Sequence, residues 1–159
     1  MSASPTAPGR ITHLVGHQSW QGEPGRTSEV YNPATGEVTG TLDLASAETV
    51  DEVVAKAKAA AREWGHTSLA RRVRALFAFR QLLEERKDEI AKAITAEHGK
   101  TYEDAKAEIS RGQEVVEFAC GIPQLLKGGF SENVSTSIDA YSILQPLGVV
   151  AINSPFNFP

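Results

Sequence analysis

The sequence has very little of the chemistry that most often marks a catalytic or metal site. It contains one cysteine, Cys120, and four histidines in 159 residues. A lone cysteine excludes an internal disulfide framework and suits a reducing compartment. The histidines lack metal-ligand spacing, and no CxxC, HExxH, GxGxxG or Walker-type motif is present, so we expect no metal site.

Charge and hydrophobicity exclude two further classes of protein. The formal net charge is −4, which gives no reason to expect a nucleic-acid partner. No apolar run approaches the roughly 18–20 residues of a membrane span. Residues 1–10 are rich in Ser, Ala and Pro and lack the apolar stretch of a secretory signal. We therefore expect a cytoplasmic protein with no membrane partner, whose residues 1–10 form a disordered tail.

Four helices are predicted in the middle of the chain. Apolar residues recur there at three- and four-residue steps, which is typical of helices with one buried face. Serine or threonine stands where N-caps are needed, and glycine stands where two of the helices should end. The predicted limits are Ser46 to Gly65, Ser68 to about Leu83, Lys87 to His98 before Gly99, and Thr101 to about Pro123.

Strand patterns flank these helices. Residues 29–31 and 38–42 predict a hairpin around a turn at 32–36, where Gly36 can adopt a positive φ. Residues 134–144 alternate polar and apolar, which indicates another strand. Residues 147–152 are uninterruptedly apolar, as in a parallel strand buried on both faces. Residues 153–159 then resemble the loop where α/β enzymes bind ligands. The alternative is that 147–152 is the edge strand of a complete small α+β domain.

Three residues are candidates for chemistry. Cys120 lies on an apolar helix face, which favours a buried structural thiol over a nucleophile. Arg111 is either part of a surface ion pair with nearby glutamates or a guanidinium that binds a substrate carboxylate. Asn157, between aromatic residues and prolines, is either a turn asparagine or an amide that donates to an oxyanion.

Several stretches resemble one known superfamily. They are Asn-Pro-Ala-Thr-Gly-Glu at 32–37, Thr-Ala-Glu-His-Gly-Lys at 95–100, residues 111–123, Gln-Pro-Leu-Gly-Val-Val at 145–150 and Pro-Phe-Asn-Phe-Pro at 155–159. Together they resemble the aldehyde dehydrogenase superfamily, and within it the CoA-acylating methylmalonate-semialdehyde dehydrogenases. The similarity spans about Ile11 to Pro159 in one register.

The resemblance implies an α/β fold, namely the incomplete N-terminal part of the aldehyde dehydrogenase fold. In that family a Rossmann-like NAD-binding domain is joined to a catalytic domain and an oligomerisation arm. Residues 11–133 would then be the N-terminal hairpin and helices of the NAD-binding domain. Residues 134–145 would be a strand of the arm, and residues 146–159 the first central strand and loop of the sheet.

The resemblance also implies an activity and roles for residues. The family branch oxidises a carboxylated semialdehyde with NAD and transfers the acyl group to CoA with loss of carbon dioxide, giving propionyl-CoA or acetyl-CoA. Asn157 would donate to the oxyanion, and Arg111 would hold the substrate carboxylate. Asn153, Ser154, Pro155 and Phe156 would line the nicotinamide side of the NAD cleft, although family members usually have an apolar residue in place of Asn153.

The same resemblance puts the nucleophilic cysteine after Pro159, so we expect this chain to be inactive alone and the full-length enzyme to be a homotetramer. Two alternatives stay open at this point. One is a non-acylating aldehyde dehydrogenase, such as a succinate-semialdehyde type. The other is a non-catalytic interaction module.

Overall fold

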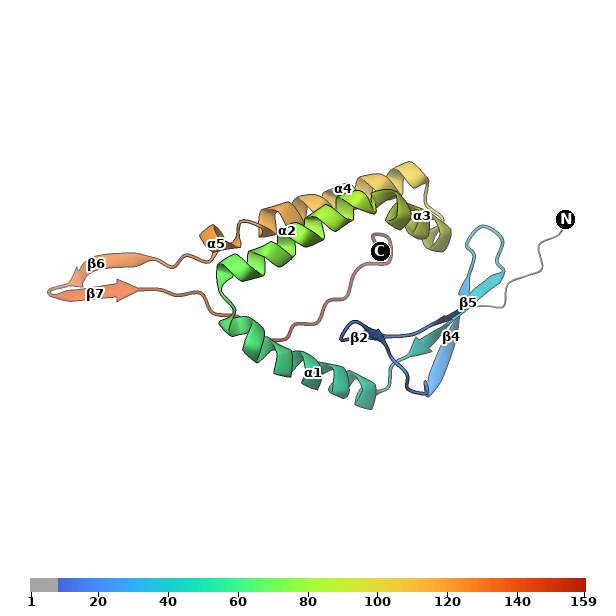
Figure 1. The fold of residues 1–159 in the computed structure, drawn as a ribbon, viewed down its shortest axis with the longest axis horizontal. Coiled ribbons are helices and arrows are strands. Elements are labelled where there is room, and N and C mark those ends of the chain that lie inside the picture. Colours follow the sequence, from blue (N-terminus) through green and yellow to red (C-terminus); the bar gives the residue numbers. More distant parts are fainter. Residues whose placement is uncertain (1–8) are drawn as a thin grey trace.

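The structure, a computed structural model, describes residues 9–159 and begins with a small mixed sheet (Figure 1). β5 (Val38–Leu44) lies between β1 (Gly9–Ile11), which is parallel to it, and β4 (Arg26–Tyr31), which is antiparallel. β2 (Leu14–Val15) and β3 (Gln18–Ser19) form a separate short hairpin. In the turn between β4 and β5, Gly36 has a φ of +74° and its amide donates to the Asn32 carbonyl at 2.8 Å. The predicted hairpin is therefore confirmed.

The N-terminal boundary differs from the prediction. Gly9 and Arg10 form part of β1 rather than a tail. The strand forms because Arg10 pairs with Thr41 in the ladder and its guanidinium binds Asp43, whose side chain is almost fully buried. The remainder of the predicted tail, residues 1–8, lies outside the described residues.

The helices follow the predicted limits closely. They are α1 (Ala47–His66), α2 (Leu69–Glu85), α3 (Lys87–His98), α4 (Tyr102–Ala119) and the single turn α5 (Ile122–Leu125). Ser46 and Thr101 are the N-caps of α1 and α4, since each hydroxyl accepts from an amide three residues later at 3.2 Å. Gly99 ends α3 in the left-handed conformation, with φ +85°. These caps confirm the predictions at Ser46, Gly99 and Thr101, whereas the prediction that Gly65 ends the first helix is wrong, because α1 continues to His66, and the Ser68 side chain makes no capping hydrogen bond to α2.

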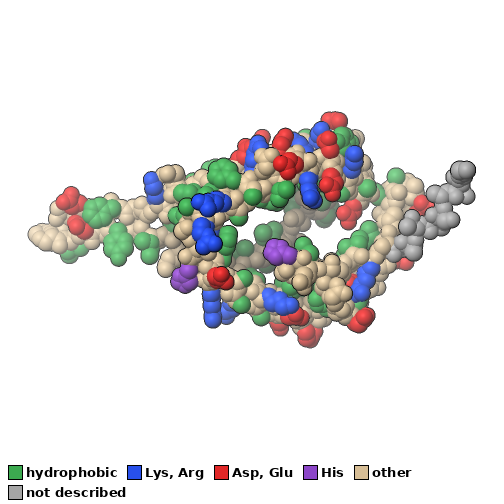
Figure 2. All heavy atoms as spheres, viewed as in Figure 1, with side chains coloured by type: hydrophobic (Ala, Val, Ile, Leu, Met, Phe, Trp, Pro, Cys, Tyr) green, Lys and Arg blue, Asp and Glu red, His purple; other side chains and the backbone are tan. Residues whose placement is uncertain are grey.

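The elements form two layers. α2, α3 and α4 pack together on one side, while α1 and the sheet lie opposite, and the C-terminal segment runs between them (Figure 1). The buried core is small and sits between α3 and α4, where Ala91, Ala105 and Ile109 pack with Ile90, Ile94 and Tyr102. Figure 2 shows that the space between the layers is hollowed, with hydrophobic side chains around the opening. None of the helices in residues 9–159 combines the length and the apolar character needed to cross a bilayer.

The prediction of one strand over residues 134–145 is wrong, because two shorter strands form in this region. Two antiparallel strands, β6 (Phe130–Ser135) and β7 (Ile138–Tyr141), form a hairpin that projects away from the helices (Figure 1). The chain reverses at Thr136 and Ser137, and Ser137 takes a φ of +60°. Because neither glycine nor proline marks this turn, the alternating pattern continues through it and hides the reversal.

The strand predicted over residues 147–152 is also wrong. The segment is extended but joins no sheet, and Leu147 and Ile152 are 97% and 85% exposed. A strand exists only through hydrogen bonds to a neighbouring strand. No neighbouring strand lies beside this segment among residues 9–159, so its apolar side chains stay uncovered.

Candidate functional site

The last residues of the chain form a tight turn around Asn157. The amide of Phe158 donates to the carbonyl of Pro155 at 3.2 Å, so that Phe156 and Asn157 are the two central residues of a β-turn. Prolines at 155 and 159 restrict the backbone on both sides. Asn157 is exposed, and within residues 9–159 its side-chain amide makes no hydrogen bond. Its two amide hydrogens are therefore available to a ligand.

Lys100 connects this turn to the helical layer. Its ammonium donates to the Asn157 carbonyl at 3.0 Å and lies 5.4 Å from the centre of the Phe158 ring. The same ammonium pairs with Glu108 of α4. The two charged side chains are only 14% and 13% exposed. The Asn157 turn is thus held by a largely buried ion pair between the α3–α4 link and α4.

Gly99 places Lys100 and also brings two distant motifs together. The Gly99 amide donates to the Thr95 carbonyl at 2.9 Å, which closes the end of α3. A Cβ added at Gly99 would lie 3.0 Å from Cγ of Pro33, in the turn between β4 and β5. The motifs at residues 32–37 and 95–100 therefore meet in space, and the contact leaves no room for a larger residue.

Arg111 lies on α4 beside the same turn. With Phe158 and Pro159 it lines a largely apolar groove of about 600 Å³, whose walls come from α2, α3 and α4. It also lines a smaller groove of about 250 Å³ with Lys100 and Phe158. Arg111 is exposed and forms none of the ion pairs found within residues 9–159, since nearby Glu108 pairs with Lys100 instead. The surface ion-pair interpretation of Arg111 is therefore not supported.

The predicted cofactor residues lie just before the Asn157 turn. Asn153, Ser154, Pro155 and Phe156 are all exposed. Phe156 and Pro159 line a third groove of about 470 Å³ against α3, with His98 at its edge. The structure thus places Phe156 in the third groove and Arg111 in the other two, whereas Asn153, Ser154, Pro155 and Asn157 line none of them; Asn157 reaches this face of the helices through the bond of its carbonyl to Lys100.

Cys120 is remote from this site. It is the C-cap of α4, whereas Lys100, which contacts Asn157, lies just before the start of that helix. Glu108, which pairs with Lys100, precedes Cys120 by 12 residues, and these residues rise about 18 Å at about 1.5 Å per residue. Cys120 is half-buried rather than fully buried as expected. A thiol at that distance cannot attack a carbonyl whose oxygen is held by Asn157.

Two other polar clusters were not found from the sequence. Asp88 of α3 accepts from Lys106 of α4 at 2.9 Å, and Lys106 lies 5.4 Å from the centre of the Tyr102 ring. Hydrogen bonding from Tyr102 and then from Lys106 holds the pKa of Asp88 below its ordinary value. Gln113 donates to Glu84 at 2.8 Å and so ties α4 to α2. Only the i, i+4 spacing of Tyr102 and Lys106 was visible in the sequence.

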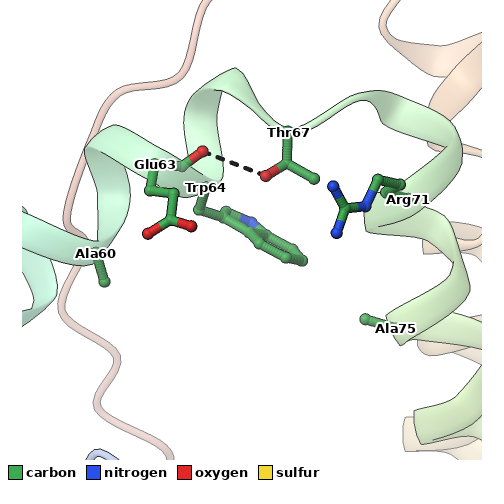
Figure 3. A pocket seen from close by; sticks show the side chains of 6 residues that line it. All are labelled: Ala60, Glu63, Trp64, Thr67, Arg71 and Ala75. Atoms are coloured by element: carbon green, nitrogen blue, oxygen red, sulfur yellow. Dashed lines mark hydrogen bonds between the residues drawn. The ribbon is translucent and has the colours of Figure 1, made fainter.

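A separate cavity of about 490 Å³ lies where α1 meets α2. Figure 3 shows Trp64 beneath the link between the two helices, with Arg71 on the far side and Thr67 donating to the Glu63 carbonyl at 3.2 Å. It contains none of the predicted site residues. Within residues 9–159, no three His, Cys, Asp or Glu side chains are grouped so that they could hold a metal ion.

A rigid asparagine turn beside an arginine-lined apolar groove suits an enzyme that polarises a carbonyl group. Residues 20–159 match the family model described as the aldehyde dehydrogenase family. The chain belongs to the aldehyde dehydrogenase family, and its structure matches the N-terminal part of that fold.

Particular relatives narrow the comparison. The malonate-semialdehyde dehydrogenase of Pseudomonas aeruginosa is 45% identical over 151 residues, which cover 95% of this chain and 30% of the relative. The acylating methylmalonate-semialdehyde dehydrogenase of Arabidopsis thaliana mitochondria is 40% identical over 99% of this chain and 26% of its own. An NAD complex from Sinorhizobium meliloti 1021, assigned as a methylmalonate-semialdehyde dehydrogenase, superposes with a TM-score of 0.91 at 44% identity, covering 97% of this chain and 31% of its own. The chain thus spans about 30% of the length of these relatives.

Proposed function

We propose that this chain is the N-terminal part of an NAD-dependent, CoA-acylating malonate- or methylmalonate-semialdehyde dehydrogenase. Oxidation and decarboxylation of the semialdehyde would give acetyl-CoA or propionyl-CoA. The observation that carries the proposal is the position of Arg111. Its guanidinium has no ion-pair partner within residues 9–159 and lines the grooves beside the Asn157 turn. Relatives named for substrates that carry both an aldehyde and a carboxylate support the assignment.

Asn157 has the properties of an oxyanion donor. A nucleophile from outside these 159 residues adds to the aldehyde carbonyl, whose oxygen then becomes anionic. The side-chain amide of Asn157 donates a hydrogen bond to that oxygen, on a turn that prolines and Lys100 hold in place. A donor of this kind lowers the barrier by roughly 2.7–4 kcal/mol, because its position costs no reorganisation during the reaction.

Arg111 has the properties of a carboxylate-binding residue. A guanidinium fork matches a carboxylate bidentately, and Arg111 presents this fork in a groove whose other walls are largely apolar. Simple aldehydes lack the group that Arg111 binds. The chain would therefore favour carboxylated semialdehydes over simple aldehydes through this residue.

The proposal includes NAD as the cofactor and CoA as a co-substrate, and different observations support each. NAD, when bound, supplies the hydride acceptor, and Asn153, Ser154, Pro155 and Phe156 would line its nicotinamide side. Asn153 and Ser154 support this role, because both are exposed and their side chains make no hydrogen bond within residues 9–159. CoA as co-substrate is supported by the acylating relative. A non-acylating aldehyde dehydrogenase, such as a succinate-semialdehyde type, is the alternative.

Domain roles complete the proposal. Residues 11–133 and 146–159 would belong to the NAD-binding domain, and the exposed β6–β7 hairpin, which includes most of residues 134–145, would be the arm that joins subunits in a homotetramer. The hairpin supports this role because all its residues are exposed, including Phe130 and Tyr141. A cytoplasmic location is part of the same proposal.

Replacing Arg111 by Ala in the full-length enzyme tests the substrate assignment. Losing a hydrogen bond between charged groups costs about 1.5–3 kcal/mol, so the KM for methylmalonate semialdehyde should rise about 10- to 150-fold. The KM for propanal should stay unchanged. Arg71→Ala is the matched control, because Arg71 lines the cavity between α1 and α2 instead.

Two results would contradict the assignment. If the KM for methylmalonate semialdehyde is unchanged in Arg111→Ala, the carboxylate role fails. If the wild-type enzyme releases free acid rather than acyl-CoA in the presence of CoA, the non-acylating alternative holds. Liquid chromatography of the products distinguishes the free acid from acyl-CoA.

A further inference from the structure

Lys100 makes a set of contacts that the proposed roles of Asn157 and Arg111 do not explain. A lysine ammonium has three hydrogen-bond donors and is strongly hydrated in water. Placing it at 14% exposure therefore costs free energy unless its donors are satisfied. Two of its partners are Glu108 and the Asn157 carbonyl, which lies 57 residues away in sequence.

Glu108 is committed to Lys100 in return. Its Oε2 accepts from the lysine ammonium, while its Oε1 is buried and has no hydrogen-bond partner within residues 9–159. The carboxylate therefore depends on Lys100 for its compensation. The pair fixes the ammonium at the surface of α4, at the point where the Asn157 backbone passes.

We infer that Lys100 is a positioning residue that anchors the Asn157 turn to α4 and so sets the place from which the Asn157 amide meets an oxyanion. The inference rests on the proposed catalytic role of Asn157. Lys100 binds the backbone of Asn157 and leaves its side chain free. The ring of Phe158 over the ammonium fixes the next residue of the same turn. Displacing a catalytic group by about 1 Å can cost about 100-fold in rate, so an anchor of this kind affects catalysis without touching substrate.

Lys106 provides a control in the same helical layer, in an ion pair whose side chains are more exposed, at 35% and 65%. It also pairs with a carboxylate, Asp88, and also lies 5.4 Å from the centre of an aromatic ring, Tyr102. It makes no contact with residues 153–159 among its hydrogen bonds and ion pairs. Lys106→Met therefore removes an ion pair between α3 and α4 and a cation–π contact within α4 without releasing the turn.

The test compares Lys100→Met with Lys106→Met in the full-length enzyme. Lys100→Met should lower kcat about 10- to 100-fold while the KM for NAD and for the semialdehyde changes less than about threefold. Lys106→Met should leave kcat within about twofold. In an Asn157→Ala background, Lys100→Met should have no further effect on kcat, because both changes act through the same amide. Equal losses in Lys100→Met and Lys106→Met, or additive losses in the double variant, would overturn the inference.

Hydrogen exchange separates this inference from the proposed function. The Phe158 amide, which donates within the turn, should exchange faster in Lys100→Met and at the wild-type rate in Lys106→Met. Unchanged exchange in Lys100→Met refutes the anchor, whatever kcat shows. If Asn157→Ala keeps wild-type kcat, the oxyanion role fails while faster exchange still supports the anchor.

A second variant guards against misfolding. Lys100→Met leaves Glu108 charged and without its partner, which is destabilising at a largely buried position. The double variant of Lys100→Met and Glu108→Gln removes both charges together. It should fold with the wild-type thermal midpoint within a few degrees and show the same loss of kcat. A wild-type kcat in this double variant would overturn the inference.

Discussion

The contact between Gly99 and Pro33 predicts that Gly99→Ala weakens the junction that carries Lys100. Gly99 has a φ of +85°, and a non-glycine residue in this left-handed region costs about 1–2 kcal/mol. The new methyl group would also lie 3.0 Å from Cγ and 3.2 Å from Cβ of Pro33. The rigid proline ring gives way little, and overpacking of this kind adds about 1–3 kcal/mol. We expect a total loss of about 2–5 kcal/mol.

Two other glycines separate these contributions. Gly36 has a φ of +74° with open space around it, so Gly36→Ala should cost only the strain of about 1–2 kcal/mol. Gly65 lies inside α1 with open space and no positive φ. Gly65→Ala should therefore stabilise the protein by about 0.5–1 kcal/mol through helix propensity. We therefore expect Gly65→Ala to be more stable than wild type, Gly36→Ala to be less stable than wild type, and Gly99→Ala to be the least stable of the three variants.

Native-state hydrogen exchange measures the effect of Gly99→Ala where it arises. The Gly99 amide donates to the Thr95 carbonyl at the end of α3, and the same amide persists in alanine. A loss of about 2–5 kcal/mol corresponds to about 30- to 5,000-fold faster exchange at that amide and in the last turn of α3. The reasoning would be refuted if the amide of residue 99 exchanged at the wild-type rate in Gly99→Ala. It would also be refuted if exchange at residue 99 in Gly99→Ala increased by no more than exchange at residue 36 does in Gly36→Ala.

Two further predictions concern other parts of the chain. Cys120→Ser should keep kcat of the full-length enzyme within about twofold, because Cys120 lies about 18 Å along α4 from Glu108, which pairs with the lysine that contacts the Asn157 turn; a loss of more than tenfold would contradict this separation. Hydrogen bonds from Arg10 hold the pKa of Asp43 below its ordinary value, so the pair stabilises the β1–β5 contact above about pH 4 and loses this contribution as the pH falls through the lowered pKa. Arg10→Met should therefore flatten the fall of the thermal midpoint below about pH 4, and an unchanged slope would contradict the role of this pair.

Local signals in the sequence predicted most of the fold. Ser46 and Thr101 mark helix starts because a hydroxyl caps free amides, and Gly99 marks a helix end because it accepts a positive φ. These signals act within a few residues and do not depend on the remainder of the chain. The pattern failed where structure depends on distant partners. Residues 147–152 have the composition of a buried strand but form none without a neighbouring strand.

The candidate site shows the same division. Arg111 and Asn157, with its flanking prolines, were candidates from the sequence pattern, and the resemblance supplied their expected roles. The connection between Lys100 and Asn157 was not, because no periodicity relates residues 57 positions apart. The Gly99–Pro33 contact was hidden for the same reason, since it joins two motifs separated by two helices. The contacts that could not be predicted from the sequence are therefore the ones that orient the site.

The sequence separation between Lys100 and Asn157 also has a consequence for the order of folding. α2, α3 and α4 contact one another through neighbouring stretches of chain, so this helical layer has low contact order and can assemble early. At a synthesis rate of about 5–20 residues per second, Asn157 leaves the ribosome roughly 3–11 s after Lys100. Helix formation takes microseconds, so the lysine–glutamate pair is in place long before the asparagine arrives. The Asn157 turn then docks on helices that have already folded, and these helices determine the geometry of the turn.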